Sequence, residues 1–125
     1  MRELKKGSLH LLVLHLLYER PSYGWEICER LRERSQGTLS FEDGAVYPLL
    51  HALEHDGLAE GYWETEAGLG EDEHAARKGA RRRYYRLTVK GRTALRAALQ
   101  QWSTFTNAVG RVLGDSALAG EDRAR

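Results

Sequence analysis

Apolar residues near the start of the chain recur at intervals of three and four positions. Between Leu9 and Leu17 this spacing predicts an amphipathic helix, and Ser8 precedes it as a candidate N-terminal cap. Additional leucines widen the apolar stripe, which predicts that this helix is buried on more than one side. Pro21 ends the first helix, because the residue before a proline disfavours the helical conformation.

Two more helices are predicted before residue 58. The second runs from Ser22 to the pair Gln36-Gly37, and its apolar positions are Trp25, Ile27, Cys28 and Leu31. The third spans residues 43–55, and Gly57 follows as its C-terminal glycine. Its buried stripe is predicted to contain Val46, Leu53 and one of the two residues Leu49 and Leu50.

After the third helix the pattern changes to short runs that contain aromatic residues. Residues 58–64 and 82–87 are predicted strands that pair as a hairpin. Alternation along the second strand turns Tyr85 and Leu87 toward the core. The residues that it turns outward are Arg82, Tyr84 and Arg86. The stretch 65–81 is rich in glycine, alanine and charge without an apolar period, which predicts a long mobile hairpin tip.

A final helix is predicted after Thr88, which caps it. Its apolar residues are spaced alternately by four and three positions, and this is the heptad pattern of a coiled coil. The seam consists of Leu95, Leu99, Trp102, Thr106, Val109 and Leu113. A second copy of the chain is the economical partner for such a seam, so we expect a homodimer.

These elements predict an α+β fold that is mainly helical. Three helices followed by a two-stranded wing is the order of a winged helix-turn-helix domain, in which the third helix enters the major groove of DNA. We expect residues 1–88 to form this DNA-binding domain, residues 89–113 to form a C-terminal dimerisation helix, and residues 114–125 to form a flexible tail.

Composition indicates the compartment but not the partner. The formal net charge is only +1. The single cysteine, Cys28, cannot form an intramolecular disulfide, and we expect a buried structural thiol rather than a redox sensor. The apolar run from Leu9 to Leu17 is interrupted by histidines, is too short to span a membrane and lacks a cleavage site. We therefore expect a cytoplasmic protein.

The distribution of charge is more informative than the total. Between residues 77 and 92 there are eight basic residues and no acidic one, which is typical of a phosphate-binding surface. The wing residues expected to contact DNA are Arg81, Arg82, Arg83, Tyr84 and Arg86. The alternative is a solvated charge run that pairs with Glu71, Asp72 and Glu73 on the same loop.

On the third predicted helix, three residues lie off the apolar stripe and can face the groove: Tyr47, Pro48 and His51. His51 can donate a hydrogen bond to a base or a phosphate. Pro48 is equally compatible with a plain helix-start role, because proline is enriched in first turns. Ala45, at the start of the helix, completes the candidate set.

Three separated motifs occur together in this chain. Residues 44–58 contain Tyr-Pro, Leu-Glu and Gly-Leu pairs, residues 21–27 contain a Gly-aromatic-Glu-Ile turn, and residues 82–88 read Arg-Arg-Tyr-Tyr-Arg-Leu-Thr with Gly91 three positions on. In their order along the chain, these motifs resemble those of the PadR family of bacterial winged-helix repressors, and the resemblance covers residues 9–99. The family usually has Ser or Pro before the glycine that stands here at position 44, and Thr after it. Here Glu42, Asp43 and Ala45 occupy those positions, so we expect base readout to differ in detail.

The resemblance implies a homodimer that represses a nearby gene by binding a pseudo-palindromic operator. It also implies relief of repression by a small effector bound between the subunits. Trp102 and Phe105 are the candidate effector contacts, with simple packing at the seam as the alternative. Neither a metal nor an organic cofactor is implied.

Two other functions stay open at the level of sequence. His51, Glu54 and His55 spell the His-x-x-Glu-His pattern of inverted zinc peptidases. A catalytic zinc needs a third protein ligand in a closed cleft, and the sequence does not supply an evident one, so we expect no enzyme activity. A winged helix used for protein contact is the second alternative, and the basic wing favours DNA.

Overall fold

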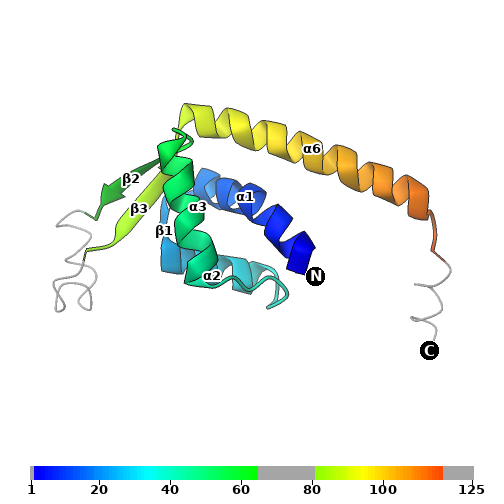
Figure 1. The fold of residues 1–125 in the computed structure, drawn as a ribbon, viewed down its shortest axis with the longest axis horizontal. Coiled ribbons are helices and arrows are strands. Elements are labelled where there is room, and N and C mark those ends of the chain that lie inside the picture. The colour runs from blue at the N-terminus through cyan, green and yellow to red at the C-terminus, as the bar shows by residue number, and fades with distance from the viewer. Residues whose placement is uncertain (1, 65–80, 117–125) are drawn as a thin grey trace. The chain divides into compact units, whose positions relative to one another are not determined.

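The computed structural model describes residues 2–64 and 81–116. Its contacts divide the chain into two compact units, Met1–Leu95 and Arg96–Arg125. The elements, in chain order, are α1 (Arg2–Glu19), β1 (Ser22–Tyr23), α2 (Gly24–Arg34), α3 (Asp43–His55), β2 (Ala59–Trp63), β3 (Arg83–Leu87) and α6 (Val89–Leu113) (Figure 1). The mainly helical α+β fold and its three-stranded antiparallel sheet agree with the winged-helix prediction.

The first helix begins earlier than predicted. α1 starts at Arg2, so Ser8 lies inside the helix and the prediction that it caps the helix was wrong. The residues before Ser8 include Arg, Glu, Leu and Lys, which are all good helix formers. The third helix spans the residues predicted for it.

A third strand precedes the second helix, and its presence corrects the prediction that Ser22 begins that helix. Ser22 and Tyr23 pair with Tyr85 and Tyr84 of β3, and β3 lies between β1 and β2. Pro21 disfavours the helical conformation at Arg20 before it, and Tyr23 keeps extended angles (φ −103°, ψ 166°) as the N-cap of α2. Two residues are too few for an alternation signal, so this strand had no pattern in the sequence.

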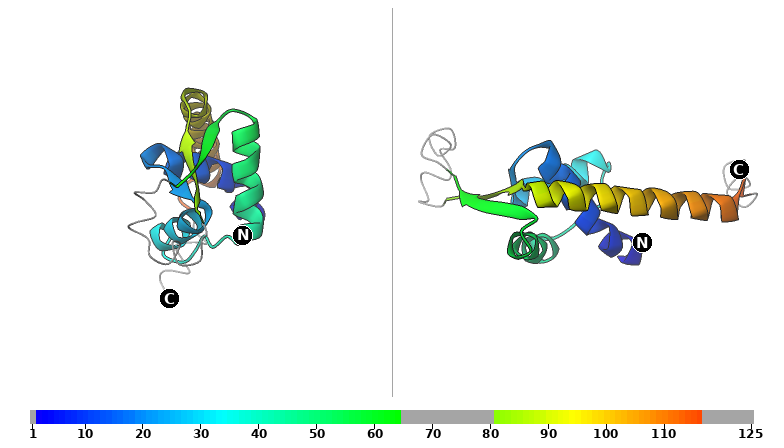
Figure 2. Two further views of the ribbon diagram at one scale, coloured as in Figure 1. Left: turned by 90° about the vertical axis from the view of Figure 1, so that its left-hand side faces the viewer. Right: turned by 90° about the horizontal axis from the view of Figure 1, so that it is seen from above.

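The hairpin of β2 and β3 is confirmed, with Ala59 opposite Leu87 and Trp63 opposite Arg83. α3 and β2 lie side by side (Figures 1 and 2). Residues 65–80 of the predicted hairpin tip lie outside the described part of the chain.

The core of the first unit is formed by the predicted apolar stripes. On α3 the stripe uses Leu50, which is fully buried, whereas Leu49 is only partly buried. Tyr85 is 1% exposed and is the largest fully buried side chain, and Leu87 packs against the core. Trp25 is 56% exposed and so does not join the stripe of α2. No described helix is both long and apolar enough to cross a membrane.

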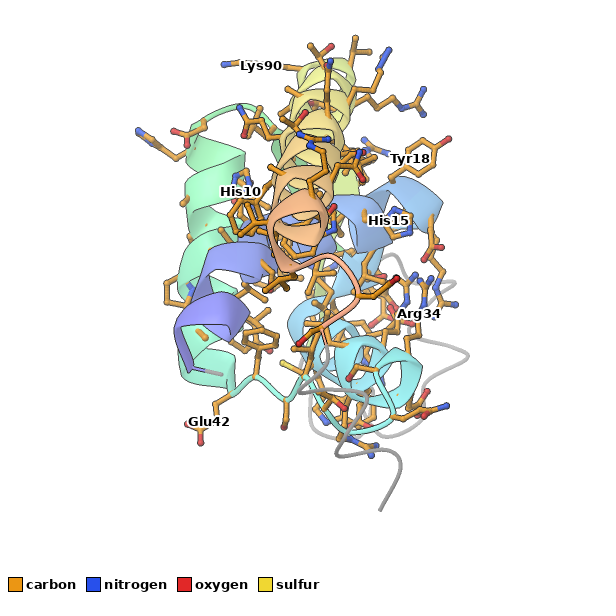
Figure 3. All side chains as sticks on the ribbon, turned by 90° about the vertical axis from the view of Figure 1, so that its right-hand side faces the viewer. His10, His15, Tyr18, Arg34, Glu42 and Lys90 are labelled. Carbon is orange, nitrogen blue, oxygen red and sulfur yellow. The ribbon has the colours of Figure 1, made fainter. Side chains whose placement is uncertain are left out.

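The first turn of α6 is anchored to the turn that follows α3. The Thr88 amide donates to the Leu58 carbonyl at 3.1 Å, and the Thr88 hydroxyl donates to the Gly57 carbonyl at 2.6 Å. The same hydroxyl accepts from the Gly91 amide at 3.0 Å, which confirms Thr88 as the cap. Lys90 donates to the Asp56 carbonyl at 2.8 Å (Figure 3). A Cβ at position 91 would lie 2.0 Å from the Leu58 carbonyl oxygen, so the close approach requires glycine.

Gly91→Ala is therefore expected to destabilise the chain by about 2–3 kcal/mol, because the added methyl group overlaps backbone that cannot move freely. Gly7→Ala is the matched control. Gly7 also lies in a helix, and nothing lies within 4 Å of an added Cβ, so alanine should stabilise by about 0.5–1 kcal/mol. Urea unfolding of the two variants measures both effects. Similar changes in both would contradict the packing described at Gly91.

Candidate nucleic-acid interface

One face of α3 is exposed along its length. Val46, Leu50 and Leu53 face the core with at most 1% exposure. The candidate groove residues lie on the other side and are all exposed: Ala45, Tyr47, Pro48 and His51. The helix begins after Glu42, whose side chain makes no capping hydrogen bond (Figure 3). The Ala45 and Val46 amides donate to the Glu42 carbonyl, so only the amides that precede them are left for an anion, as the helix dipole favours.

Tyr47 serves packing as well as the exposed face. A Cβ at Gly24 would lie 2.4 Å from the Tyr47 ring, so the ring occupies the space that a side chain at position 24 would need. Tyr47 is 37% exposed. This contact fixes α3 against the start of α2 and explains why a Gly and a Tyr occur in two separate motifs of the sequence.

Three tyrosines cross the outer face of the sheet in register, and we call them the tyrosine ladder: Tyr23, Tyr84 and Tyr62. The ring centroids of Tyr23 and Tyr84 are 5.2 Å apart, and those of Tyr84 and Tyr62 are 5.9 Å apart. Two arginines cover the ends of the ladder, with Arg82 4.6 Å from the Tyr23 centroid and Arg86 4.9 Å from the Tyr62 centroid. Burial raises the pKa of Tyr23 above its ordinary value, although the charge of Arg82 opposes this rise.

The two arginines of β3, and Arg82 directly before this strand, are paired with carboxylates of the domain. Arg86 bonds Glu60 at 2.7 Å, Arg83 bonds Glu54 at 2.8 Å, and Arg82 lies 3.9 Å from Glu64. The predicted alternative partners Glu71, Asp72 and Glu73 lie outside the described residues. Arg81 is exposed and makes no ion pair within the described residues. Each arginine as a phosphate contact stays a prediction.

Glu64 is a buried carboxylate at the end of β2. It is 6% exposed, and its Oε2 atom has no hydrogen-bond partner in the part of the chain that the structure describes. Its amide donates to the Arg82 carbonyl at 2.9 Å, which extends the hairpin by one pair beyond the strands.

Glu54 has partners that account for its carboxylate without a metal. Its Oε2 atom accepts hydrogen bonds from Arg83 and from the Gly61 amide. Within residues 2–64 and 81–116, no group of three or more His, Cys, Asp or Glu side chains could hold a metal ion. The His-x-x-Glu-His pattern therefore does not assemble a site among these residues.

Arg30 joins three elements, and sequence reasoning missed this role. It donates to the Leu16 carbonyl at 3.1 Å, to the Ser22 hydroxyl at 2.9 Å and to Glu19 at 2.7 Å. Its side chain is 12% exposed. Burial lowers the pKa of this guanidinium, the nearby Arg20 lowers it further, and Glu19 partly opposes both. A basic residue on the partly apolar face of α2 was the available signal.

Glu19 gathers cations at the end of α1. Arg34 also bonds it, and His15 lies 3.3 Å away on the same helix (Figure 3). Desolvation alone would raise the pKa of Glu19, but the hydrogen bond and charge of Arg34, with His15 and Arg30, lower it overall. The carboxylate is therefore held ionised where it ties α1 to α2.

The second unit exposes its apolar residues. None of residues 96–116 is buried. Trp102 is 47% exposed and Phe105 is 55% exposed, with ring centroids 6.3 Å apart. The seam residue Leu95 belongs instead to the core of the first unit, where it is 4% exposed. The exposed seam therefore begins at Leu99.

Comparisons with known proteins identify a family of transcriptional regulators. Residues 13–97 match the Transcriptional regulator PadR-like family. The transcriptional regulator Rv3488 of Mycobacterium tuberculosis is 32% identical over 104 residues, which cover 81% of this chain and 84% of that protein.

Solved structures show the same similarity. A PadR family transcriptional regulator from Eggerthella lenta is 31% identical with a TM-score of 0.72, covering 91% of this chain and 88% of that one. A PadR family regulator from Clostridium difficile is 28% identical with a TM-score of 0.68, covering 86% of this chain and 99% of that one. With more than half of its length matched to the family, the chain belongs to the PadR-like family of transcriptional regulators.

Proposed function

We propose that this regulator is a homodimeric repressor that binds a pseudo-palindromic operator through α3 and the wing. The observation that carries the proposal is the exposed face of α3, which is held on a packed scaffold by the Tyr47 and Gly24 contact. A rigid helix with its first amides open is suited to a major groove. Such a regulator acts on the chromosome in the cytoplasm.

Within this proposal the contacts divide by role. Ala45, Pro48 and His51 face the bases or the flanking phosphates, because they are exposed early and midway along α3. Arg81 supplies a phosphate contact at the wing, since it is exposed and its charge is not compensated by a described carboxylate. Arg82 and Arg86 cover the two ends of the tyrosine ladder, which lies beside the DNA. Their charges are compensated by Glu64 and Glu60.

The test of DNA recognition is binding to the DNA upstream of the gene, measured by fluorescence anisotropy across a salt series. We expect selective binding, and His51→Ala should weaken it about fivefold through loss of one hydrogen bond. The matched control is His55→Ala, an exposed histidine in the last turn of the same helix. Arg81→Gln should weaken binding to all sequences and reduce the salt slope by about 1.

Equal losses of DNA affinity in the two histidine variants would contradict the proposal that the early and middle residues of α3 face the DNA. Binding that is weak and unselective in the parent chain would instead favour the protein-contact function. A reporter under the same upstream DNA distinguishes repression from activation, and increased expression on adding the protein would overturn the repressor assignment.

The proposed dimer rests on the exposed seam of α6. Leu99, Val109 and Leu113 are 43%, 37% and 62% exposed, which is unfavourable for a lone helix in water. Burial of this seam against the same seam of a second copy removes these residues from water and is self-complementary. Trp102 lies in the seam and contributes packing there. Phe105 flanks it, with ring centroids 6.3 Å apart, and the two rings are where a small effector between subunits would bind.

A pair of threonines tests the dimer. Thr106→Asp is expected to raise the dimer dissociation constant about 100-fold, because two carboxylates per dimer lose solvation in the seam. Thr104→Asp is the matched control, since it makes the same change two positions away on the opposite side of the helix. Both residues are exposed in the single chain, so neither change disturbs its core. Analytical ultracentrifugation measures the constants, and equal values would contradict the seam.

A further inference from the structure

One carboxylate oxygen links the recognition helix to both strands of the wing. Glu54 lies near the end of α3, and its Oε2 atom accepts a hydrogen bond from the Gly61 amide of β2 at 3.2 Å. The same atom accepts from Arg83 of β3 at 2.8 Å. We call this arrangement of Glu54, Gly61 and Arg83 the wing joint.

The joint is closely fitted. A Cβ at position 61 would lie 2.6 Å from the Glu54 oxygen and 2.8 Å from an Arg83 nitrogen, so any side chain there would displace both partners. Trp63 covers Arg83 from β2, with the guanidinium carbon 5.1 Å from the ring centroid. The side chains of Arg83 and Glu54 are only 32% and 34% exposed. Arg83 is thus held by a carboxylate and by an aromatic ring.

Arg86, the other arginine of β3, also has a carboxylate and an aromatic ring as partners, but both of them lie within the wing. Strand alternation puts Arg83 on the side of the buried Tyr85, whereas Arg86 lies on the side of the tyrosine ladder. Arg86 pairs with Glu60, which stands opposite it in the hairpin. This second ion pair therefore joins the two strands of the wing to each other and does not join the wing to α3. The Glu60 and Arg86 side chains are also more exposed, at 57% and 53%.

We propose that the wing joint sets the position of the wing relative to α3, and that Arg83 acts in DNA binding as a positioning residue and not as a phosphate contact. This inference rests on the proposed function. A helix in one groove and a wing on the adjacent backbone must engage together, so a fixed geometry between them lowers the ordering cost of binding. Arg83 donates a hydrogen bond to Glu54, and its charge is compensated there.

The two roles of Arg83 predict opposite results for Glu54→Ala. If Arg83 contacted phosphate, removing a carboxylate would free a cation, reduce repulsion and strengthen DNA binding. In the positioning role, Glu54→Ala weakens operator binding about tenfold and leaves the salt slope unchanged. Arg83→Ala has the same effect on operator affinity. The double variant binds no more weakly than either single variant, because all three variants lack the same wing joint.

Glu54→Gln tests the geometry separately from the charge. Its amide oxygen can still accept from Gly61 and Arg83, so binding should recover most of the loss seen with alanine. Glu60→Ala and Arg86→Ala are the matched controls for an ion pair inside the wing, and their effects should not be coupled to Glu54. All affinities are measured well below the unfolding temperature of each variant, with the active fraction determined by titration.

A second readout follows the joint without DNA. The indole resonance of Trp63 in a ¹H–¹⁵N spectrum should shift in Glu54→Ala and stay near its parent position in Glu54→Gln, since the ring covers Arg83. An unshifted indole would overturn the joint. Tighter DNA binding by Glu54→Ala, a salt slope reduced by about 1 in Arg83→Ala, or additive single effects would overturn the positioning role. A parent chain that binds no operator overturns the proposed function itself, which is a distinct result.

Discussion

Burial of α1 is the constraint on which the first unit depends. Val13, Leu14 and Leu17 are at most 2% exposed, and α1 packs against both β3 and α2. Each fully buried leucine contributes roughly 1.5–3 kcal/mol, so this one helix supplies much of the stability of a small domain. Arg30 then satisfies the Leu16 carbonyl near the end of α1 and ties that end to Ser22. A broad apolar helix with a bonded end provides a fixed support for the exposed elements.

The surface elements are positioned by contacts that leave little room for change. Tyr47 fits against the bare backbone of Gly24, and Gly91 lets the first turn of α6 approach the Leu58 carbonyl. Both glycines are required by neighbouring atoms and not by a turn. Close contacts with the backbone therefore hold the exposed face of α3 and the wing in place. The residues available for recognition can be separated from the residues that orient them.

Elements with an apolar or aromatic pattern, α3 and the β2–β3 hairpin among them, could be predicted from the sequence, whereas the two-residue strand β1 and the side-chain pairings could not. The thirteen residues of α3 carry enough apolar repeats to define its bounds and the outward side of His51. β1 has two residues and no period, so the sequence pattern predicts the start of a helix there. The partners Glu54 and Arg83 are 29 positions apart, and only the hairpin register brings them together. In sequence the run of arginines around position 82 reads as one basic patch, but alternation along β3 sends its members to two faces.

The arrangement of these arginines also explains why the net charge of +1 is compatible with a regulator of transcription. Arg82, Arg83 and Arg86 are matched by Glu64, Glu54 and Glu60, so these three arginines contribute a weaker long-range field than their number in the sequence indicates. A compensated guanidinium contributes little to non-specific attraction, which depends on released counterions. Affinity for DNA in the proposed complex must then come mainly from shape, from contacts of α3 with base edges, and from the pairing of two half-sites. In the proposed complex the operator is then discriminated from bulk DNA more by geometry than by charge.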